Sequence, residues 1–110
     1  MAKIDARLPK GMRDFLPGEV LKREYVFGVV TEVFHTFGFE PIYTPALEML
    51  ETLLGKSGEE ADKLIFYAQH PGGKEELGLR YDLTVPLARY FAMHEHELSM
   101  PFRRYHIAPV

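Results

Sequence analysis

Two side chains between Leu79 and Tyr90 have the types and the spacing to bind a charged small molecule. Asp82 carries a carboxylate, and Thr84 carries a hydroxyl two residues further along the chain. A carboxylate accepts hydrogen bonds and a hydroxyl can accept them as well, so the two together could hold an ammonium group. A shielded, charge-assisted contact of this kind is worth on the order of a few kcal/mol. The pair would therefore suit an amino acid as the bound molecule.

The elements on either side would place this pair in a turn between a strand and a helix. Leu79 ends a predicted strand, and Pro86 stands in the first turn of a helix predicted over residues 84–94. A strand fixes the position of such a turn, and the first turn of a helix offers N–H groups without helical acceptors. A second interpretation stays open, in which Asp82 or Thr84 merely caps the helix.

Other polar clusters give weaker grounds for chemistry. Residues 70–74 lack the spacing of a phosphate-binding loop and are expected to form a hairpin turn. His94 and His96 are two residues apart, whereas metal pairs on a helix are four apart, so we expect exposed side chains. The acidic segment 59–62 is expected to be solvated, and no metal site is predicted. Residues 103–106 form a basic and aromatic cluster that either faces phosphates or lies on a solvated strand face.

Composition and charge are those of a soluble domain. The 110 residues are 46% hydrophobic and 26% charged, which suffices for one packed core. The net charge of −3 argues against a nucleic-acid footprint over the whole chain, and the absence of cysteine excludes disulfides and thiolate chemistry. The sequence has neither the apolar core of a signal peptide nor an apolar run of about 20 residues. We therefore expect a cytoplasmic chain that does not bind membranes.

Hydrophobic periodicity predicts the first elements of the chain. A long helix is expected to open at Pro17 or Gly18 and to end at Gly38, in a left-handed conformation. Its wide apolar face must pack on a sheet or a partner. A short strand follows over residues 39–43. Because Pro41 cannot donate to a ladder, this strand is expected at an edge or at an interface.

The rest of the chain reads as a second helix, a hairpin, a third helix and a last strand. Their predicted ranges are 46–54, 63–69 with 75–81, 84–94, and 100–110. In the last strand, alternation places Arg104 and His106 on one side. Because the spacing does not suit successive βαβ units, the expected fold class is α+β, with a mainly antiparallel or mixed sheet flanked by helices.

Four stretches of the sequence, in order, resemble the histidyl-tRNA synthetases, which are class II aminoacyl-tRNA synthetases. Residues 9–17 resemble the opening loop of that family, and residues 38–48 resemble motif 1 of class II synthetases. Residues 79–90 resemble the histidine-binding segment, and residues 104–110 resemble the strand that leads into motif 2. The order and spacing hold along nearly the whole chain, which makes the resemblance specific.

The resemblance assigns roles to residues in two of these stretches. It implies that Asp82, Leu83 and Thr84 contact histidine, with Asp82 and Thr84 at the α-ammonium group. It also implies a homodimer that is built through motif 1. The interface residues that it implies are Gly38, Phe39, Pro41, Ile42 and Pro45.

The resemblance further implies a histidine–tRNA ligase. Such an enzyme uses ATP and Mg²⁺ to convert L-histidine to histidyl-adenylate, and it then transfers the histidyl group to tRNA(His). Residues 1–110 would be a single unit, the N-terminal part of the catalytic domain from motif 1 to the strand entering motif 2. The motif 2 arginine, motif 3 and the anticodon-binding domain would lie beyond it. We therefore expect no catalytic residue in this chain and no activity of the chain alone.

Two alternatives remain at this point. The regulatory subunit of ATP phosphoribosyltransferase shares the fold and senses histidine without ligating it. Its equivalent segment usually reads Arg-Pro-Asp-Met-Thr, whereas residues 80–84 here read Arg-Tyr-Asp-Leu-Thr, which favours the ligase. The second alternative is a free-standing dimerisation module that uses the long helix and the strand beside Pro45.

Overall fold

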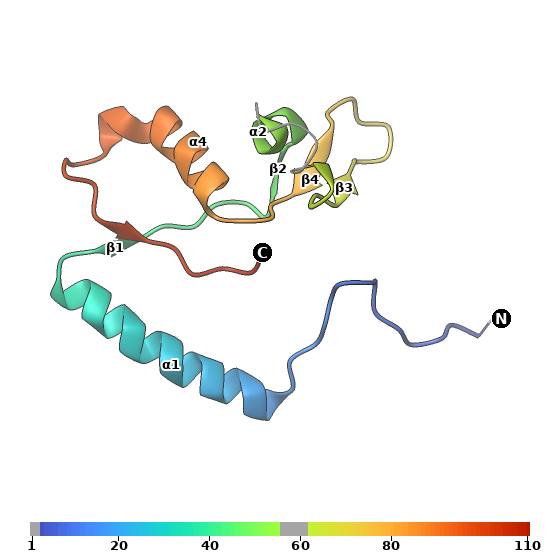
Figure 1. The fold of residues 1–110 in the computed structure, drawn as a ribbon, viewed down its shortest axis with the longest axis horizontal. Coiled ribbons are helices and arrows are strands. Elements are labelled where there is room, and N and C mark those ends of the chain that lie inside the picture. Colours follow the sequence, from blue (N-terminus) through green and yellow to red (C-terminus); the bar gives the residue numbers. More distant parts are fainter. Residues whose placement is uncertain (1–2, 56–61) are drawn as a thin grey trace. The chain divides into compact units, whose positions relative to one another are not determined.

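The computed structural model describes residues 3–55 and 62–110 (Figure 1). The chain divides into two compact units, Met1–Phe37 and Gly38–Val110, and each is described by itself. Folding of residues 1–110 as a single unit stays a prediction. Glu59 and Glu60, expected to be solvated, lie outside the described residues.

The first unit is an irregular opening segment followed by one helix. Helix α1 spans Pro17–Thr36, with proline at the start as predicted. Its end is also confirmed, because Gly38 follows with a φ of 77°. The opening segment is tied to the helix by Phe15, whose ring lies 4.5 Å from the guanidinium carbons of both Arg13 and Arg23.

The second unit holds two small sheets. Strands β2 (Leu47–Met49), β4 (Leu77–Leu79) and β3 (Tyr67–Ala68) form an antiparallel sheet in the order β2-β4-β3. Strands β1 (Glu40–Pro41) and β5 (Arg104–Tyr105) pair in parallel. The predicted α+β class with a mainly antiparallel sheet is therefore confirmed, with one parallel pair beside it (Figure 1).

In the part of this unit that the structure describes, the sheets are accompanied by α2 (Leu50–Leu54), α4 (Thr84–His94) and a 3-10 turn, η1 (Glu95–Glu97). The predicted range of α4 is confirmed. None of the helices in the described part of the chain is long and apolar enough to cross a membrane.

The helix predicted over residues 46–54 is wrong in its first half. Residues 47–49 form β2, which pairs with β4 and places Glu48 inward between the exposed Leu47 and Met49. This is the period of two that a strand requires. The leucines at 47, 50 and 54 imitate helical spacing, but the helix begins only at Leu50.

The predicted hairpin is confirmed, with strands shorter than expected. Tyr67 lies opposite Gly78 in the pairing of β3 with β4. In the predicted turn, Gly73 N donates to His70 O at 2.8 Å. Pro41 behaves as expected of an edge strand. Its neighbours Glu40 and Ile42 donate their N–H groups to the carbonyls of Arg103 and Tyr105, at and just before β5, so the missing donor of Pro41 faces away from that partner.

Gly78 leaves no room for a side chain in the centre of the antiparallel sheet. A Cβ atom there would lie 2.7 Å from Ile65 Cγ2 and 3.0 Å from Leu53 Cδ1. Leu53 is itself fully buried at 1% exposure. The hairpin and α2 therefore close over β4 at a point where only hydrogen fits.

We predict that Gly78→Ala destabilises the chain by about 1–3 kcal/mol, because the added methyl group overpacks this contact. The matched control is Gly28→Ala in α1, where nothing lies within 4 Å of the added Cβ. That change should stabilise the chain by about 0.5–1 kcal/mol through helix propensity. Urea unfolding of both variants measures the two effects. Equal free energies of unfolding for Gly78→Ala and the parent chain would contradict the prediction.

Candidate functional site

Asp82 caps helix α4 with one of its two carboxylate oxygens. Its Oδ1 accepts a hydrogen bond from Val85 N at 3.2 Å, so the capping interpretation is confirmed for this residue. Within the described residues Oδ2 has no hydrogen-bond partner. Leu83 is the half-buried residue before the helix, and Thr84 is its exposed first residue. The structure therefore brings a free carboxylate oxygen and an exposed hydroxyl to one helix start.

Arg80 fixes the beginning of this turn. Only 8% of the residue is exposed. Its Nε donates to Pro109 O at 3.0 Å, and its Nη1 donates to Thr44 O at 3.0 Å and Pro45 O at 3.2 Å. Its backbone N–H also donates to Ala46 O at 3.0 Å. Three segments distant in sequence thus meet at one side chain, a contact that the sequence reasoning missed.

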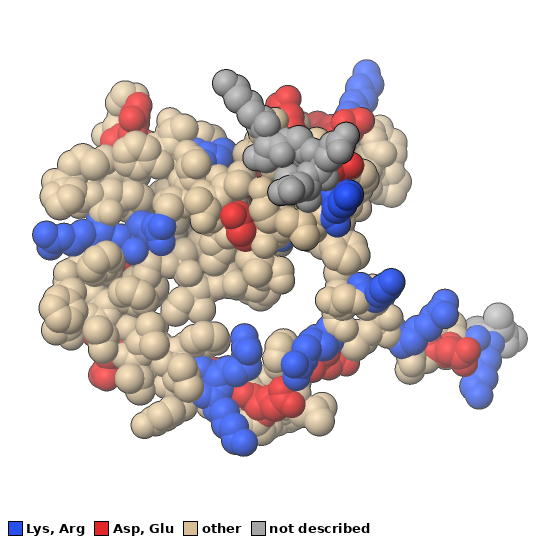
Figure 2. Space-filling model, in the orientation of Figure 1, with Lys and Arg blue, Asp and Glu red and all other residues tan. Residues whose placement is uncertain are grey.

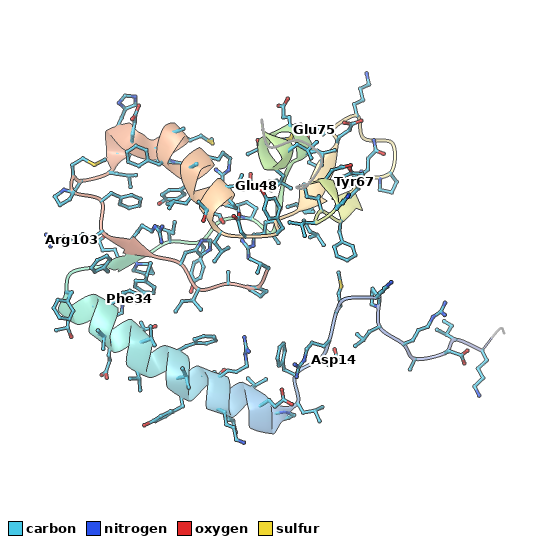
Figure 3. All side chains as sticks on the ribbon, viewed as in Figure 1. Asp14, Phe34, Glu48, Tyr67, Glu75 and Arg103 are labelled. Atoms are coloured by element: carbon cyan, nitrogen blue, oxygen red, sulfur yellow. The ribbon has the colours of Figure 1, made fainter. Side chains whose placement is uncertain are left out.

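A buried ion pair holds α4 against β2. Arg89 Nε lies 3.0 Å from Glu48 Oε1 and 2.9 Å from Glu48 Oε2. Glu48 is only 5% exposed, and Figure 3 shows it beside α4. This contact also escaped the sequence reasoning, which placed Glu48 on a helix. The alternation of leucine, glutamate and methionine over residues 47–49 was the available signal.

Aromatic packing holds the other end of α4. The rings of Tyr90 and Phe91 stack on Phe102, with ring centres 6.2 Å and 6.1 Å apart. Phe102 precedes β5, so the helix is held both to the antiparallel sheet and to the parallel pair. His94 ends the helix and contacts Glu97 at 3.4 Å. The helix start that carries Asp82 is therefore part of a well-supported element.

His106 is a half-buried imidazole whose two ring nitrogens are shielded from solvent. Both of its ring nitrogens are inaccessible and lack a partner among the described residues. Burial, together with the nearby guanidinium groups of Arg80 and Arg104, lowers the pKa of His106 below its usual value of 6.5. His106 is consequently a neutral group at neutral pH.

The residues predicted for a dimer interface lie along the segment that runs from the end of α1 through β1 to the loop before β2. Gly38, Pro41 and Pro45 are exposed and Phe39 is half-buried. Ile42 is 6% exposed and belongs to the core of the single chain. An open cavity of about 330 Å³ adjoins this region. Its lining residues are Gly38, Glu40, Glu97, Leu98, Ser99, Pro101, Phe102 and Arg103.

A second open cavity lies at the hairpin. Its volume is about 350 Å³, and its polar lining comes from Tyr67, Gln69 and Glu76. Neither of the two cavities is lined by Asp82 or Thr84. The face of the molecule in Figure 2 shows Lys and Arg interspersed with Asp and Glu, in keeping with the small net charge.

Comparison with known proteins identifies a family whose members resemble this chain. The sequence model of the family described as histidyl-tRNA synthetase matches residues 11–110. The chain is 48% identical to histidine–tRNA ligase of Bacteroides fragilis and 50% identical to that of Rhodopirellula baltica. These matches cover 94% and 97% of this chain but 27% and 24% of the two relatives.

The chain belongs to the histidyl-tRNA synthetase family. It spans about a quarter of the length of the curated relatives it matches. Among solved structures it resembles histidyl-tRNA synthetase from Nostoc sp. PCC 7120, with a TM-score of 0.83 and 36% identity over 94% of this chain and 24% of that one. This likeness confirms the predicted fold, a portion of a class II synthetase catalytic domain.

A second solved structure keeps the regulatory alternative in view. It is a Bacillus halodurans C protein described as an ATP phosphoribosyltransferase regulatory subunit/histidyl-tRNA synthetase. Its TM-score is 0.82 and its identity is 32%, over 100% of this chain and 29% of that one. The family's fold therefore occurs under both descriptions.

We predict that His106 makes the stability of this synthetase segment fall as the pH drops below about 6.5. The unfolded chain protonates His106 near pH 6.5, whereas the folded chain resists this proton because the pKa of His106 is lowered. The loss begins as the pH falls through 6.5 and is complete below the folded pKa. Urea unfolding between pH 5 and 8 measures it.

The matched variant is His106→Leu, which cannot titrate and strands no hydrogen-bond partner. Its stability should fall less steeply with acidity than that of the parent chain. At pH 8 the two chains should be similarly stable, because the parent imidazole is then neutral and unbonded. If the stabilities of the two chains changed with pH in parallel, His106 would have the same pKa in the folded and unfolded states, and the prediction would be wrong.

Proposed function

We propose that this chain is the amino-acid recognition part of a histidine–tRNA ligase. The observation that carries the proposal is the arrangement of the Asp82 carboxylate. Its Oδ1 caps α4, while its Oδ2 has no hydrogen-bond partner among the residues that the structure describes. A carboxylate in this state can accept from the α-ammonium group of histidine without giving up the helix cap. Thr84 offers a second oxygen at the helix start, and Leu83 offers an apolar contact. Membership of the family supports the same assignment.

The proposed reaction has two steps. The carboxylate of L-histidine attacks the α-phosphate of ATP to give histidyl-adenylate and pyrophosphate, and the histidyl group then passes to the 3′ end of tRNA(His). In this scheme Asp82 and Thr84 hold the ammonium end of histidine so that its carboxylate points toward ATP. Mg²⁺ would screen the phosphate charges. The described residues contain no group of three or more His, Asp or Glu side chains that could hold a metal ion, so we assign none of them to Mg²⁺.

The proposal includes assembly and place of action. The whole enzyme would be a cytoplasmic homodimer. Its interface would include Gly38, Phe39, Pro41 and Pro45, with Ile42 packing behind them within each subunit. Support comes from the exposed β1 segment, whose proline leaves one side of the strand without a donor.

The second candidate is a histidine-sensing regulatory subunit. The description of the Bacillus halodurans structure favours keeping it. Such a protein would bind histidine through the same turn but would catalyse no exchange of pyrophosphate into ATP. Histidine-dependent exchange by the full-length protein separates the two candidates.

We predict that Asp82→Asn in the full-length protein raises the KM for histidine by about 10- to 100-fold, the effect of losing one charge-assisted contact. Asparagine keeps an oxygen for the Val85 N–H, so the helix cap survives. The matched control is Asp82→Ala, which loses the cap as well and should cost about 1 kcal/mol of stability. ATP–pyrophosphate exchange and thermal unfolding measure the two effects. Unchanged kinetics for Asp82→Asn would leave Asp82 with the capping role alone.

We also predict that the 110-residue chain alone catalyses no ATP–pyrophosphate exchange. Stabilising the transition state requires positive charges at the α-phosphate, and the proposal assigns none of the described arginines to ATP. Histidine should bind to the chain weakly. Exchange above background by the purified chain, or sub-micromolar histidine binding by calorimetry, would refute this.

A further inference from the structure

We propose that Arg80 is a positioning residue for histidine recognition, a clamp that sets where the Asp82 carboxylate stands. This inference rests on the function proposed above. It is carried by the geometry of the guanidinium group, which joins three segments of the second unit. Arg80 stands at the beginning of residues 80–84, which we call the recognition turn.

The clamp has two arms. Nε reaches Pro109 O at 3.0 Å, in the segment after β5. Nη1 reaches Thr44 O at 3.0 Å, Thr44 Oγ1 at 3.3 Å and Pro45 O at 3.2 Å, in the loop before β2. The planar guanidinium fixes the angle between these arms. The end of β4 is thus held to both neighbouring loops at once.

The acceptors of Arg80 are all neutral oxygens. Within the described residues no carboxylate pairs with it, in contrast to Arg89, which has Glu48. A buried cation loses hydration, and neutral acceptors offset that cost less well than an anion does. A well-packed apolar residue would serve stability alone at least as well. The guanidinium at this position is better explained by the geometry it imposes.

Asp82 lies two residues beyond the clamp. The backbone N–H of Arg80 donates to Ala46 O at 3.0 Å, and Val85 N donates to Asp82 Oδ1 at 3.2 Å. The short turn is therefore pinned at both ends, and its free Oδ2 has a defined place. Recognition of a small ligand needs such groups placed within about 0.5 Å. Weakening one of the Arg80 hydrogen bonds would therefore displace Asp82 Oδ2 without unfolding the unit.

Arg80→Lys in the full-length protein tests this inference. Lysine keeps the positive charge but, as a single nitrogen, cannot reach both arms. We expect the KM for histidine to rise about tenfold, with the KM for ATP changed less than twofold and Tm within a few degrees of the parent. The matched control is Arg7→Lys in the exposed opening segment, which should leave all three values unchanged. A purely structural role would instead lower Tm and leave the KM for histidine near the parent value, and that result would overturn the inference.

Thr44→Val provides a second variant in case the lysine variant does not fold. It removes one acceptor, Thr44 Oγ1 at 3.3 Å, and leaves the cation in place. The KM for histidine should rise about two- to threefold at unchanged Tm. An unchanged KM for histidine in Thr44→Val, beside an unfolded Arg80→Lys, would overturn the inference.

Calorimetry with histidine separates this inference from the proposed function. If the parent protein binds histidine but shows no exchange, the ligase proposal fails, and the Kd of Arg80→Lys still tests the clamp. If the parent exchanges and Arg80→Lys keeps the parent affinity, only the clamp fails. A parent protein that neither binds nor exchanges would overturn both.

Discussion

The second unit depends on a buried guanidinium, Arg80, which has no carboxylate partner among residues 3–55 and 62–110. Arg80 directly follows β4, the central strand of the antiparallel sheet, and it donates to the loop between β1 and β2 and to the segment after β5. These bonds connect the antiparallel sheet to the parallel pair, since no strand is shared between the two. Since few of the described apolar side chains are fully buried, polar contacts of this kind determine how the sheets meet.

The ion pair between Glu48 and Arg89 adds a second connection of the same type. It joins β2 to α4 through a carboxylate that is almost wholly buried. Removing one partner of such a pair leaves a charge in a poorly solvated place, so the pair favours one arrangement of helix and sheet over its alternatives. Glu48 and Arg89 therefore help to position the start of α4, beside Asp82, although neither side chain belongs to the recognition turn.

Asp82 shows how a structural role and a binding role can share one side chain. On local grounds a carboxylate before a helix is first a cap, and the bond to Val85 N confirms that role. The cap orients the carboxylate and leaves its second oxygen without a hydrogen-bond partner among the described residues. The capping and binding interpretations are therefore compatible, and the cap becomes the reason that the proposed site is preorganised.

Local signals in the sequence predicted several elements because their causes are local. Pro17 and Gly38 bound the long helix, residues 70–74 turn the hairpin, and the range of α4 follows from its apolar spacing. The second helix was predicted too long for the same reason. Three leucines imitate helical spacing, whereas pairing with β4, a distant segment, makes residues 47–49 a strand.

The sequence by itself determined the class of fold, the family and the turn that carries Asp82 and Thr84, because motif order and short-range periodicity are written along the chain. Only the tertiary structure decided which oxygen of Asp82 is free, that Gly78 fills a space without room for a methyl group, and that Arg80 and Glu48 are buried. The partners of those two side chains lie 29 to 41 residues away. Contacts at such separations form only when the sheets assemble in the folded chain, so no local sequence pattern predicts them.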